Sequence, residues 1–333
     1  MLKRFCKDKG FLVAGGSGFL GSHFVKRLLQ LKYVKKVVVL DNFCTGSLNN
    51  LAEVIGDPRL EVIETDISQT LPKLKEKFDF IYHLAALANP FDYEKNPIDT
   101  LTVNSDGVRN LIELARKNKA VFYYFSSSEV YGIYDCIPYR GLNEEETVSR
   151  LILGKPRSPY AVGKCFGEEL TRHLCDNYGI KYTIIRPFNV YGPNMDVKTN
   201  YGRVIPNFIT WALKKEPLQI NGDGTQIRTF CYIDDFIEAL FLLLKINLSS
   251  EVINIGSTQQ IRILDLARLV NEILDNRSSG YRFVERYQFE PLIRTPDLTK
   301  IIRLTNWEPA TELKKGLKNT SDWLKTHLKI GER

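Results

Sequence analysis

Apolar residues in the first half of the chain come in short continuous runs, separated by stretches with helical spacing. The runs are FLVAG (11–15), KVVVLDN (36–42), LEVIETD (60–66), FDFIYHLAA (78–86) and AVFYYFSSS (120–128). Runs of this kind, rich in β-branched and aromatic residues, are typical of strands buried on both faces of a parallel sheet. Between the first two runs Phe24 and Leu28 recur at i, i+4, as do Val25 and Leu29, which predicts an amphipathic helix.

The alternation continues toward the middle of the chain. We expect a long helix from about Ile98 to Lys117, a second helix from Tyr160 to about Tyr178, and a strand in KYTIIRPFNV (181–190). The run EVINIGS (251–257) reads as a later member of the same sheet. Alternating strands and helices predict an α/β fold with a doubly wound parallel Rossmann sheet.

The sequence pattern changes after Val190, where Gly, Pro and Asn become frequent. The elements predicted after this point are short and include both helices and strands. We expect the stretch from Ile263 to the end to be mostly helical. The sequence thus predicts a cofactor-binding Rossmann domain of residues 1–190 and 229–260. It also predicts a smaller mixed α/β lobe of residues 191–228 and 261–333, which binds the substrate.

Composition excludes several classes of protein. The 333 residues are 44% hydrophobic and 26% charged, and the net charge of +7 is not gathered in a basic stripe with interleaved aromatic residues, so we expect no nucleic-acid partner. The longest apolar run (236–246) is too short to cross a bilayer and contains Glu238, so we expect a buried helix and no membrane partner. The six cysteines form no CxxC pair and no His has zinc spacing, which predicts reduced thiols, no metal site and a cytoplasmic location.

A glycine-rich loop follows the first predicted strand and opens the first predicted helix. In it Gly15, Gly18 and Gly21 have the spacing Gly-x-x-Gly-x-x-Gly, which suits a tight turn, close approach of a pyrophosphate and close helix packing. Asp41 ends the next strand, where its carboxylate can accept a hydrogen bond from a ribose hydroxyl and would repel a 2′-phosphate. These residues predict a site for NAD rather than NADP.

Together with Asp66, Ser127 and the pair Tyr160/Lys164, this loop resembles the extended, nucleotide-sugar branch of the short-chain dehydrogenase/reductase family. The resemblance covers nearly the whole chain. It implies an enzyme that oxidises a sugar nucleotide at C4 by hydride transfer to NAD. The implied cofactor contacts are Gly15, Gly18, Phe19, Leu20, Gly21, Asp41, Asn42, Asp66, Ile67, Leu84, Ala85, Ala86, Asn104, Tyr160 and Lys164.

Tyr160 and Lys164 are one helical turn apart, so they share a helix face. A free tyrosine has a pKa of about 10 and is a poor base at neutral pH. An ammonium at about 4 Å, with an effective dielectric of about 20, supplies roughly the 4 kcal/mol that lowers the pKa by about 3 units, and the positive nicotinamide adds to it. We therefore expect Tyr160 to be the base, helped by Ser127, with Ser126 and Ser128 as competitors for the serine role.

Further motifs resemble the substrate segments of the same family. The resemblance assigns Asn189, Arg203 and Arg228 to the nucleotide diphosphate end, and Glu129 and Arg294 to a sugar carboxylate. Ser128 is a further expected substrate contact.

Branches of this family share C4 oxidation and differ in the step that follows it. The motifs SSEVYG, RSPYAVGK, GRVIPNF and RTPD resemble UDP-glucuronate decarboxylases, and the Asp that dehydratases have before this Glu is replaced by Ser128. Ala161, Val162, Ser127 and Ile293 depart from the decarboxylase pattern, and the first three are epimerase-like. Decarboxylation is thus the favoured hypothesis, with a 4-epimerase and a dedicated C4 dehydrogenase as alternatives.

A non-catalytic nucleotide sensor is a remote alternative, because such a protein would be expected to lack Tyr160 or Lys164. The resemblance also implies a homodimer, paired through the long helix after residue 98 and the Tyr160 helix.

Overall fold

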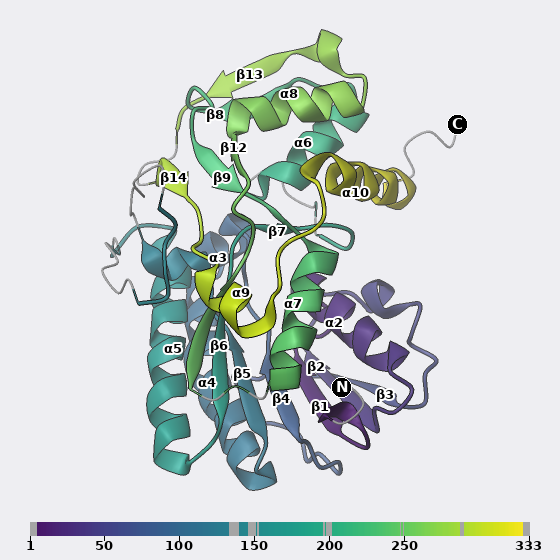
Figure 1. The fold of residues 1–333 in the computed structure, drawn as a ribbon, viewed down its shortest axis with the longest axis vertical. Helices are drawn as coiled ribbons and strands as arrows, with labels where there is room; N and C mark the ends of the chain where they lie inside the picture. Colours follow the sequence, from purple (N-terminus) through teal and green to yellow (C-terminus); the bar gives the residue numbers. More distant parts are fainter. Residues whose placement is uncertain are drawn as a thin grey trace.

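A computed structural model describes residues 5–132, 140–145, 151, 153–195, 197, 202–246, 248, 250–286 and 290–328. Its centre is a sheet of seven parallel strands, which confirms the predicted fold class (Figure 1). The order across the sheet is β11 (Glu251–Ile255), β6 (Tyr182–Pro187), β5 (Val121–Phe125), β4 (Phe80–His83), β1 (Gly10–Ala14), β2 (Lys36–Asp41) and β3 (Leu60–Glu64).

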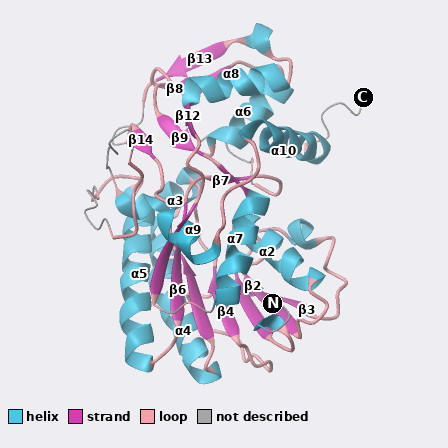
Figure 2. Cartoon of the chain, in the orientation of Figure 1, coloured by secondary structure: helices cyan, strands magenta, loops and turns pink. Residues whose placement is uncertain are grey.

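Helices cover both faces of this sheet (Figure 2). The faces separate because successive strand residues point to opposite sides: Phe11 and Val13 of β1 belong to one core cluster, whereas Leu12 and Ala14 belong to the other. The first cluster includes buried residues of α2 (Phe19–Gln30) and α7 (Ile233–Ile246), and the second those of α4 (Pro97–Asn118) and α5 (Ser158–Tyr178).

The predicted helix over 236–246 is part of α7, which buries most of its side chains and exposes Glu238. None of the helices in the described part of the chain combines the length and the apolar composition needed to cross a bilayer.

The later segments build a second layer beyond one end of the sheet, drawn at the top of Figure 1. It comprises α6 (Val204–Leu213), β8 (Leu218–Asn221), β9 (Ile227–Thr229), β12 (Gln260–Arg262), α8 (Ile263–Ile273), η3 (Arg277–Ser279), β13 (Tyr281–Val284), β14 (Ile293–Arg294) and α10 (Leu313–His327). The remaining elements are η1 (Leu48–Leu51), α3 (Pro90–Lys95), η2 (Ser128–Tyr131), β7 (Val190–Tyr191), β10 (Cys231–Tyr232) and α9 (Thr299–Thr305).

Two details differ from the expected pattern. The stretch after Ile263 contains helices α8, α9 and α10, but two strands interrupt it: β13 pairs with β8, and β14 pairs with β9. The strand expected over 181–190 ends at Pro187 and resumes as the separate two-residue strand β7, which pairs with β10. In each case the partner strand is remote in sequence, so local periodicity carries no signal for it.

Because the central strands are parallel, their carboxyl ends meet at one edge of the sheet. The strand order reverses between β1 and β4, and ligands of doubly wound sheets bind at such a switch point. The loops after β1, β2, β4 and β5 therefore converge below the second layer.

Candidate active site

A cleft of about 860 Å³ opens at this edge of the sheet. Its walls include all but one of the residues that the sequence singled out. They are Gly15, Gly18, Phe19, Leu20, Gly21, Asp41, Asn42, Asp66, Ile67, Leu84, Ala85, Ala86, Ser127, Ser128, Glu129, Tyr160, Lys164, Asn189, Arg203, Arg228 and Arg294.

Asn104 is the exception, because it does not line the cleft, and its expected contact with the cofactor stays a prediction. Its side chain lies buried between α4 and α5, where its amide donates to the carbonyl of Thr100 (2.8 Å) and accepts from the hydroxyl of Tyr124 (2.9 Å). Asn104 is therefore engaged in helix packing, and it does not line the cleft.

The glycine loop forms a turn that side chains would obstruct. Gly15 has φ of +79°, and a Cβ there would lie 2.5 Å from the backbone nitrogen of Ala85. A Cβ on Gly21 would lie 2.1 Å from the carbonyl oxygen of Gly15, so the third glycine permits packing of α2 on the loop itself rather than on the sheet.

Gly18 differs, because a Cβ there would meet only the Gly15 oxygen, at 3.3 Å. Its missing side chain leaves open the space over the start of α2. That helix begins without a side-chain cap and without an acidic residue in its first turn. The free N–H groups and the positive end of the helix dipole suit a pyrophosphate, so the residues present fit a dinucleotide.

Asp41 closes β2 as a buried carboxylate. Its oxygens accept the backbone N–H groups of Ser17 (2.9 Å) and Phe43 (3.0 Å). Burial raises the pKa of this carboxyl, and those two hydrogen bonds oppose the rise. Asp66, by contrast, is exposed and accepts the N–H and hydroxyl of Ser68 at 2.8 and 2.7 Å.

Tyr160 lies near the start of α5, in the first turn after Pro159. Its ring stacks on that of Tyr93 from α3, with centroids 5.2 Å apart. Burial raises the pKa of Tyr160 to about 12; the hydrogen bond with Ser127 and the charge of Arg203 lower it, and Glu129 raises it further. The protein's own groups thus leave the phenol a weak acid.

Lys164 is 1% exposed and donates to the carbonyl of Phe125 at 2.7 Å. Burial lowers its pKa to about 7, against the opposing charge of Glu168. Its Nζ lies 5.8 Å from the centroid of the Tyr160 ring. Within the protein alone burial dominates at Tyr160 and raises its pKa. The lowering expected from Lys164 together with the positive nicotinamide stays a prediction.

The three consecutive serines have different partners. Ser126 donates to Glu168 at 2.5 Å, and Ser128 is the first residue of η2. Ser127 caps that turn by accepting the N–H of Glu129 (3.2 Å), and its hydroxyl hydrogen-bonds to Tyr160. The geometry thus favours Ser127 over its neighbours for the serine role.

Glu129 and Arg294 form an ion pair in the lining of the cleft. Arg157 faces the same carboxylate at 4.0 Å, and Arg294 also donates to the carbonyl of Gly132 (3.1 Å). Burial raises the pKa of Glu129, but the two guanidinium groups lower it by more, to about 2. Glu129 is therefore ionised at neutral pH.

Arg228 lines the cleft, but its guanidinium already has partners. It donates to Glu290 (2.7 Å) and to the carbonyls of Ile227, Pro291 and Leu292 (2.8, 2.9 and 3.2 Å). Arg228 stands beside Arg294 in the paired strands β9 and β14, so a phosphate here would compete with Glu290.

The other two residues expected at the diphosphate have strained backbones. Asn189 has φ of +39° and donates to the carbonyl of Thr229 at 2.9 Å, and Arg203 has φ of +24° at the start of α6. Such conformations cluster at functional sites because the surrounding structure must enforce them.

Among the cleft residues that sequence reasoning did not single out are Tyr93, Arg157 and Glu290. Arg157 donates to the Tyr93 hydroxyl at 3.1 Å, which links it to the ring stacked on Tyr160. A signal for Arg157 existed, since it stands three residues before Tyr160 at the start of a predicted helix. Tyr93 and Glu290 have no such local signal, because their partners are distant in sequence.

The amino-acid sequence of this chain is similar to those of known proteins. Residues 11–256 match the NAD dependent epimerase/dehydratase family. UDP-glucuronic acid decarboxylase 3 from Arabidopsis thaliana is 38% identical over 315 residues, which cover 94% of this chain and 89% of the relative.

Two solved structures resemble the whole fold. A dTDP-glucose 4,6-dehydratase from Streptomyces venezuelae with NAD bound has a TM-score of 0.85 and 29% identity, and covers 95% of this chain and 97% of its own. A UDP-glucuronic acid 4-epimerase variant from Bacillus cereus, in complex with NAD and a fluorinated UDP-glucuronic acid, has a TM-score of 0.83 and 31% identity. That match covers 96% of this chain and 99% of the neighbour.

Proposed function

The chain belongs to the NAD-dependent epimerase/dehydratase family, and from that premise we propose that it oxidises UDP-glucuronate at C4 and then decarboxylates it. The observation that carries this proposal is the cluster of Glu129, Arg157 and Arg294 in the same cleft as Tyr160 and the glycine turn. Two guanidinium groups beside one carboxylate leave positive charge for a second, and a sugar acid supplies one.

When bound, NAD would supply the acceptor for the hydride from C4 of the sugar. The open start of α2 at Gly18 and the carboxylate of Asp41 are the groups of this chain that would hold its pyrophosphate and adenosine ribose. Asp41 is buried and fixed by two N–H groups, so it would repel a 2′-phosphate and favour NAD over NADP.

Tyr160 accepts the proton of the C4 hydroxyl through its phenolate, and the Ser127 hydroxyl hydrogen-bonds to the same oxygen. Since burial raises the Tyr160 pKa, a positive charge on Lys164 favours the phenolate. Lys164, whose pKa is about 7, supplies that charge in its protonated form, which is anchored on the Phe125 carbonyl.

A ketone at C4 turns the sugar acid into a β-keto acid. The C5–C6 bond then breaks, CO₂ leaves, and the electron pair of that bond is taken up by the C4 carbonyl as an enolate, which is protonated at C5. Return of the hydride and a proton to the C4 ketone would restore the hydroxyl, so that loss of CO₂ is the only net change in the sugar nucleotide. Arg294 and Arg157 orient the carboxylate before it leaves, while the negative Glu129 favours loss of its charge as CO₂.

A 4-epimerase acting on the same sugar acid is the second candidate. Ala161 and Val162 line the cleft directly after Tyr160, where the decarboxylase pattern has acidic residues. In this alternative the hydride returns to the opposite face of the C4 ketone and the carboxylate stays.

We also propose the homodimer, with α4 and α5 as the pairing helices. Ile98 and Phe166 on these helices are 68% and 50% exposed, which suits a covered face. A sedimentation measurement at micromolar concentration tests it, and a monomer there removes the idea. The division into residues 1–190 with 229–260 and 191–228 with 261–333 stays a prediction.

The deciding experiment mixes the purified protein with NAD and UDP-glucuronate and analyses the sugar nucleotide by mass spectrometry. Loss of one CO₂ supports decarboxylation. An unchanged mass with a new chromatographic peak supports the epimerase, and loss of two hydrogens with NADH absorbance supports a C4 dehydrogenase. If no sugar nucleotide reacts while NAD still binds, the proposal fails in favour of a sensor.

A further inference from the structure

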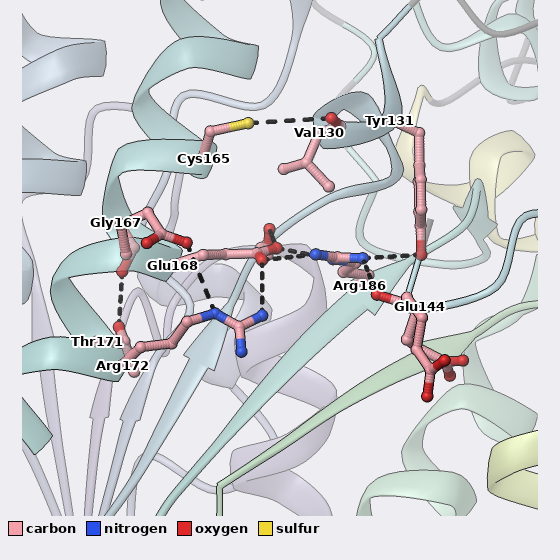
Figure 3. A network of polar contacts seen from close by, with 12 residues as sticks. Val130, Tyr131, Glu144, Cys165, Gly167, Glu168, Thr171, Arg172 and Arg186 are labelled. Atoms are coloured by element: carbon pink, nitrogen blue, oxygen red, sulfur yellow. Dashed lines mark hydrogen bonds and ion pairs between the residues drawn. The ribbon is translucent and has the colours of Figure 1, made fainter. Parts of the chain in front are cut away.

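A buried polar network joins helix α5 to strand β6 (Figure 3). It reaches the cleft at Ser126, which is one of the lining residues. Its centre is Glu168 of α5, which is 4% exposed. The guanidinium of Arg186 donates to its two oxygens at 2.8 and 2.7 Å, and the hydroxyl of Ser126 donates at 2.5 Å. Glu168 thus accepts three short hydrogen bonds from two neighbouring strands, while Arg172 of its own helix lies at 3.7 Å.

The network reaches both ends of the turn that carries Ser127 and Glu129. At its start, Ser126 is bound to Glu168. At its end, the hydroxyl of Tyr131 accepts from Arg186 (2.9 Å). The turn is therefore attached twice to one carboxylate–guanidinium pair.

The same network extends to the segment that carries Arg294. Tyr131 donates to the side chain of Asn254 at 2.9 Å, and that side chain donates to the carbonyl of Leu142 at 2.8 Å. Leu142 in turn exchanges backbone hydrogen bonds with Thr295 and Asp297, both of 2.8 Å. A chain of buried contacts thus connects Glu168 with both partners of the Glu129–Arg294 pair.

Glu168 also stands one helical turn after Lys164, on the same buried face of α5. The other groups facing the ammonium are the Phe125 carbonyl, the rings of Tyr124 and Tyr160, and His83, whose pKa burial lowers to about 3. Before Tyr160 is ionised for catalysis, none of these carries a negative charge, since burial also raises the pKa values of both tyrosines. Glu168 is the anion that opposes the loss of the lysine's charge on burial.

We propose that Glu168 is a positioning residue of this active site, which keeps Lys164 as an ammonium and holds the Ser127–Glu129 turn against the helix of Tyr160. The catalytic part of this inference rests on the proposed function, whereas the charge on Lys164 does not. A carboxylate that only stabilised the fold would leave the titration of Lys164 unchanged.

The experiment follows Lys164 directly, by NMR of protein labelled with ¹³C-lysine, with the signal assigned by its loss in Lys164→Met. Glu168→Gln keeps the shape and removes the charge, so Lys164 should lose its proton at lower pH than in wild type, where its pKa is about 7. Glu169→Gln is the matched control: it removes a neighbouring, 62% exposed carboxylate and should not move the signal. An identical titration in wild type and Glu168→Gln overturns the proposal.

Once the wild type is shown to turn over a sugar nucleotide, the kinetics of Glu168→Gln provide a second test of the proposal. Glu168→Gln should lower kcat by about 10- to 100-fold, with little change in KM, because misplaced catalytic groups affect the chemical step. The loss should grow toward alkaline pH, where the lysine is deprotonated first. A loss equal at every pH would mark a structural role only. If the wild type has no activity, the proposed function fails while the NMR result still decides the role of Glu168.

Glu168→Gln leaves Arg186 without its ion-pair partner and could prevent folding. The double variant Glu168→Gln with Arg186→Met removes both charges, and replacing a buried pair as a whole is far less disruptive than breaking it. It should show the same downward shift of the Lys164 titration. A return to the wild-type titration in the double variant would contradict a direct effect of Glu168.

Discussion

The two ends of the cleft differ in whether backbone or side chains form the wall. At the cofactor end the wall is mostly backbone: a glycine turn, an uncapped helix start and the close approach of residues 15 and 85. At the sugar end the wall is made of long charged side chains, Glu129, Arg157 and Arg294, which come from three remote parts of the chain.

The difference fits the two ligands of the proposed function. Backbone N–H groups bind a pyrophosphate whatever the neighbouring side chains are, so that end suits a cofactor shared by a whole family. Charged side chains that pair with one another can be replaced by other residues without disturbing the sheet. The sugar end therefore suits a ligand and a reaction that differ from one enzyme to another. Tyr160 and Lys164 stand where the two ends meet.

The largest effect is expected at that junction. Tyr160→Phe removes the phenolic oxygen but keeps the ring stacked on Tyr93, so kcat should fall by about 10³-fold while NAD still binds. Turnover of UDP-glucuronate and NAD binding by calorimetry are the two measurements. Activity within about tenfold of wild type would remove Tyr160 from the base role.

At the cofactor end, Gly21→Ala should act through the backbone. The added Cβ would lie 2.1 Å from the Gly15 oxygen and 2.7 Å from the Gly16 Cα, so the turn itself must move. We expect the free energy of unfolding to fall by about 1–3 kcal/mol and NAD affinity to fall about tenfold or more. Urea unfolding and calorimetry measure both.

The matched control is Gly56→Ala, where a Cβ meets nothing within 4 Å and φ is not positive. Its stability should stay within about 0.5 kcal/mol of wild type. Equal effects of the two substitutions would mean that neither stability nor NAD affinity depends on the tight turn.

At the sugar end, Arg294→Met should separate substrate from cofactor. It removes the guanidinium that pairs with Glu129, so KM for UDP-glucuronate should rise by about 10- to 100-fold, as expected for lost hydrogen bonds to a charged group. NAD affinity should change by less than about twofold. Arg262→Met, exposed on β12 of the same small sheet, should leave both unchanged. A parallel loss of NAD binding would show that the two ends are not independent.

The smallest effect is expected from the titration of Glu129. Its folded-state pKa is lowered from 4.5 to about 2, so its stabilising contribution is complete above about pH 4.5 and is lost as the pH falls toward 2. Between pH 5.5 and 3.5 the wild type should therefore lose about 1 kcal/mol more stability than Glu129→Gln. Urea unfolding at the two pH values measures this, with Glu169→Gln expected to follow the wild type. Equal losses in wild type and Glu129→Gln would contradict the ion pair.

The sequence by itself determined the sheet, its helices and the cofactor end of the cleft. Alternation of apolar runs and amphipathic stretches is a local property, and so is the spacing of Gly15, Gly18 and Gly21 before a helix. The position of Asp41 at the end of a strand is equally local. These features are set by residues a few positions apart. Because the strands of the sheet are parallel, their carboxyl ends then meet at one edge and bring these features together.

Only the tertiary structure decided which side chains face one another. It engaged Arg228 with Glu290, moved Asn104 into the helix interface, and placed Arg157 between Tyr93 and Glu129. The physical reason is that an ion pair or a buried pKa depends on distance and desolvation in three dimensions. The same holds for Tyr160, because burial in the fold raises its pKa.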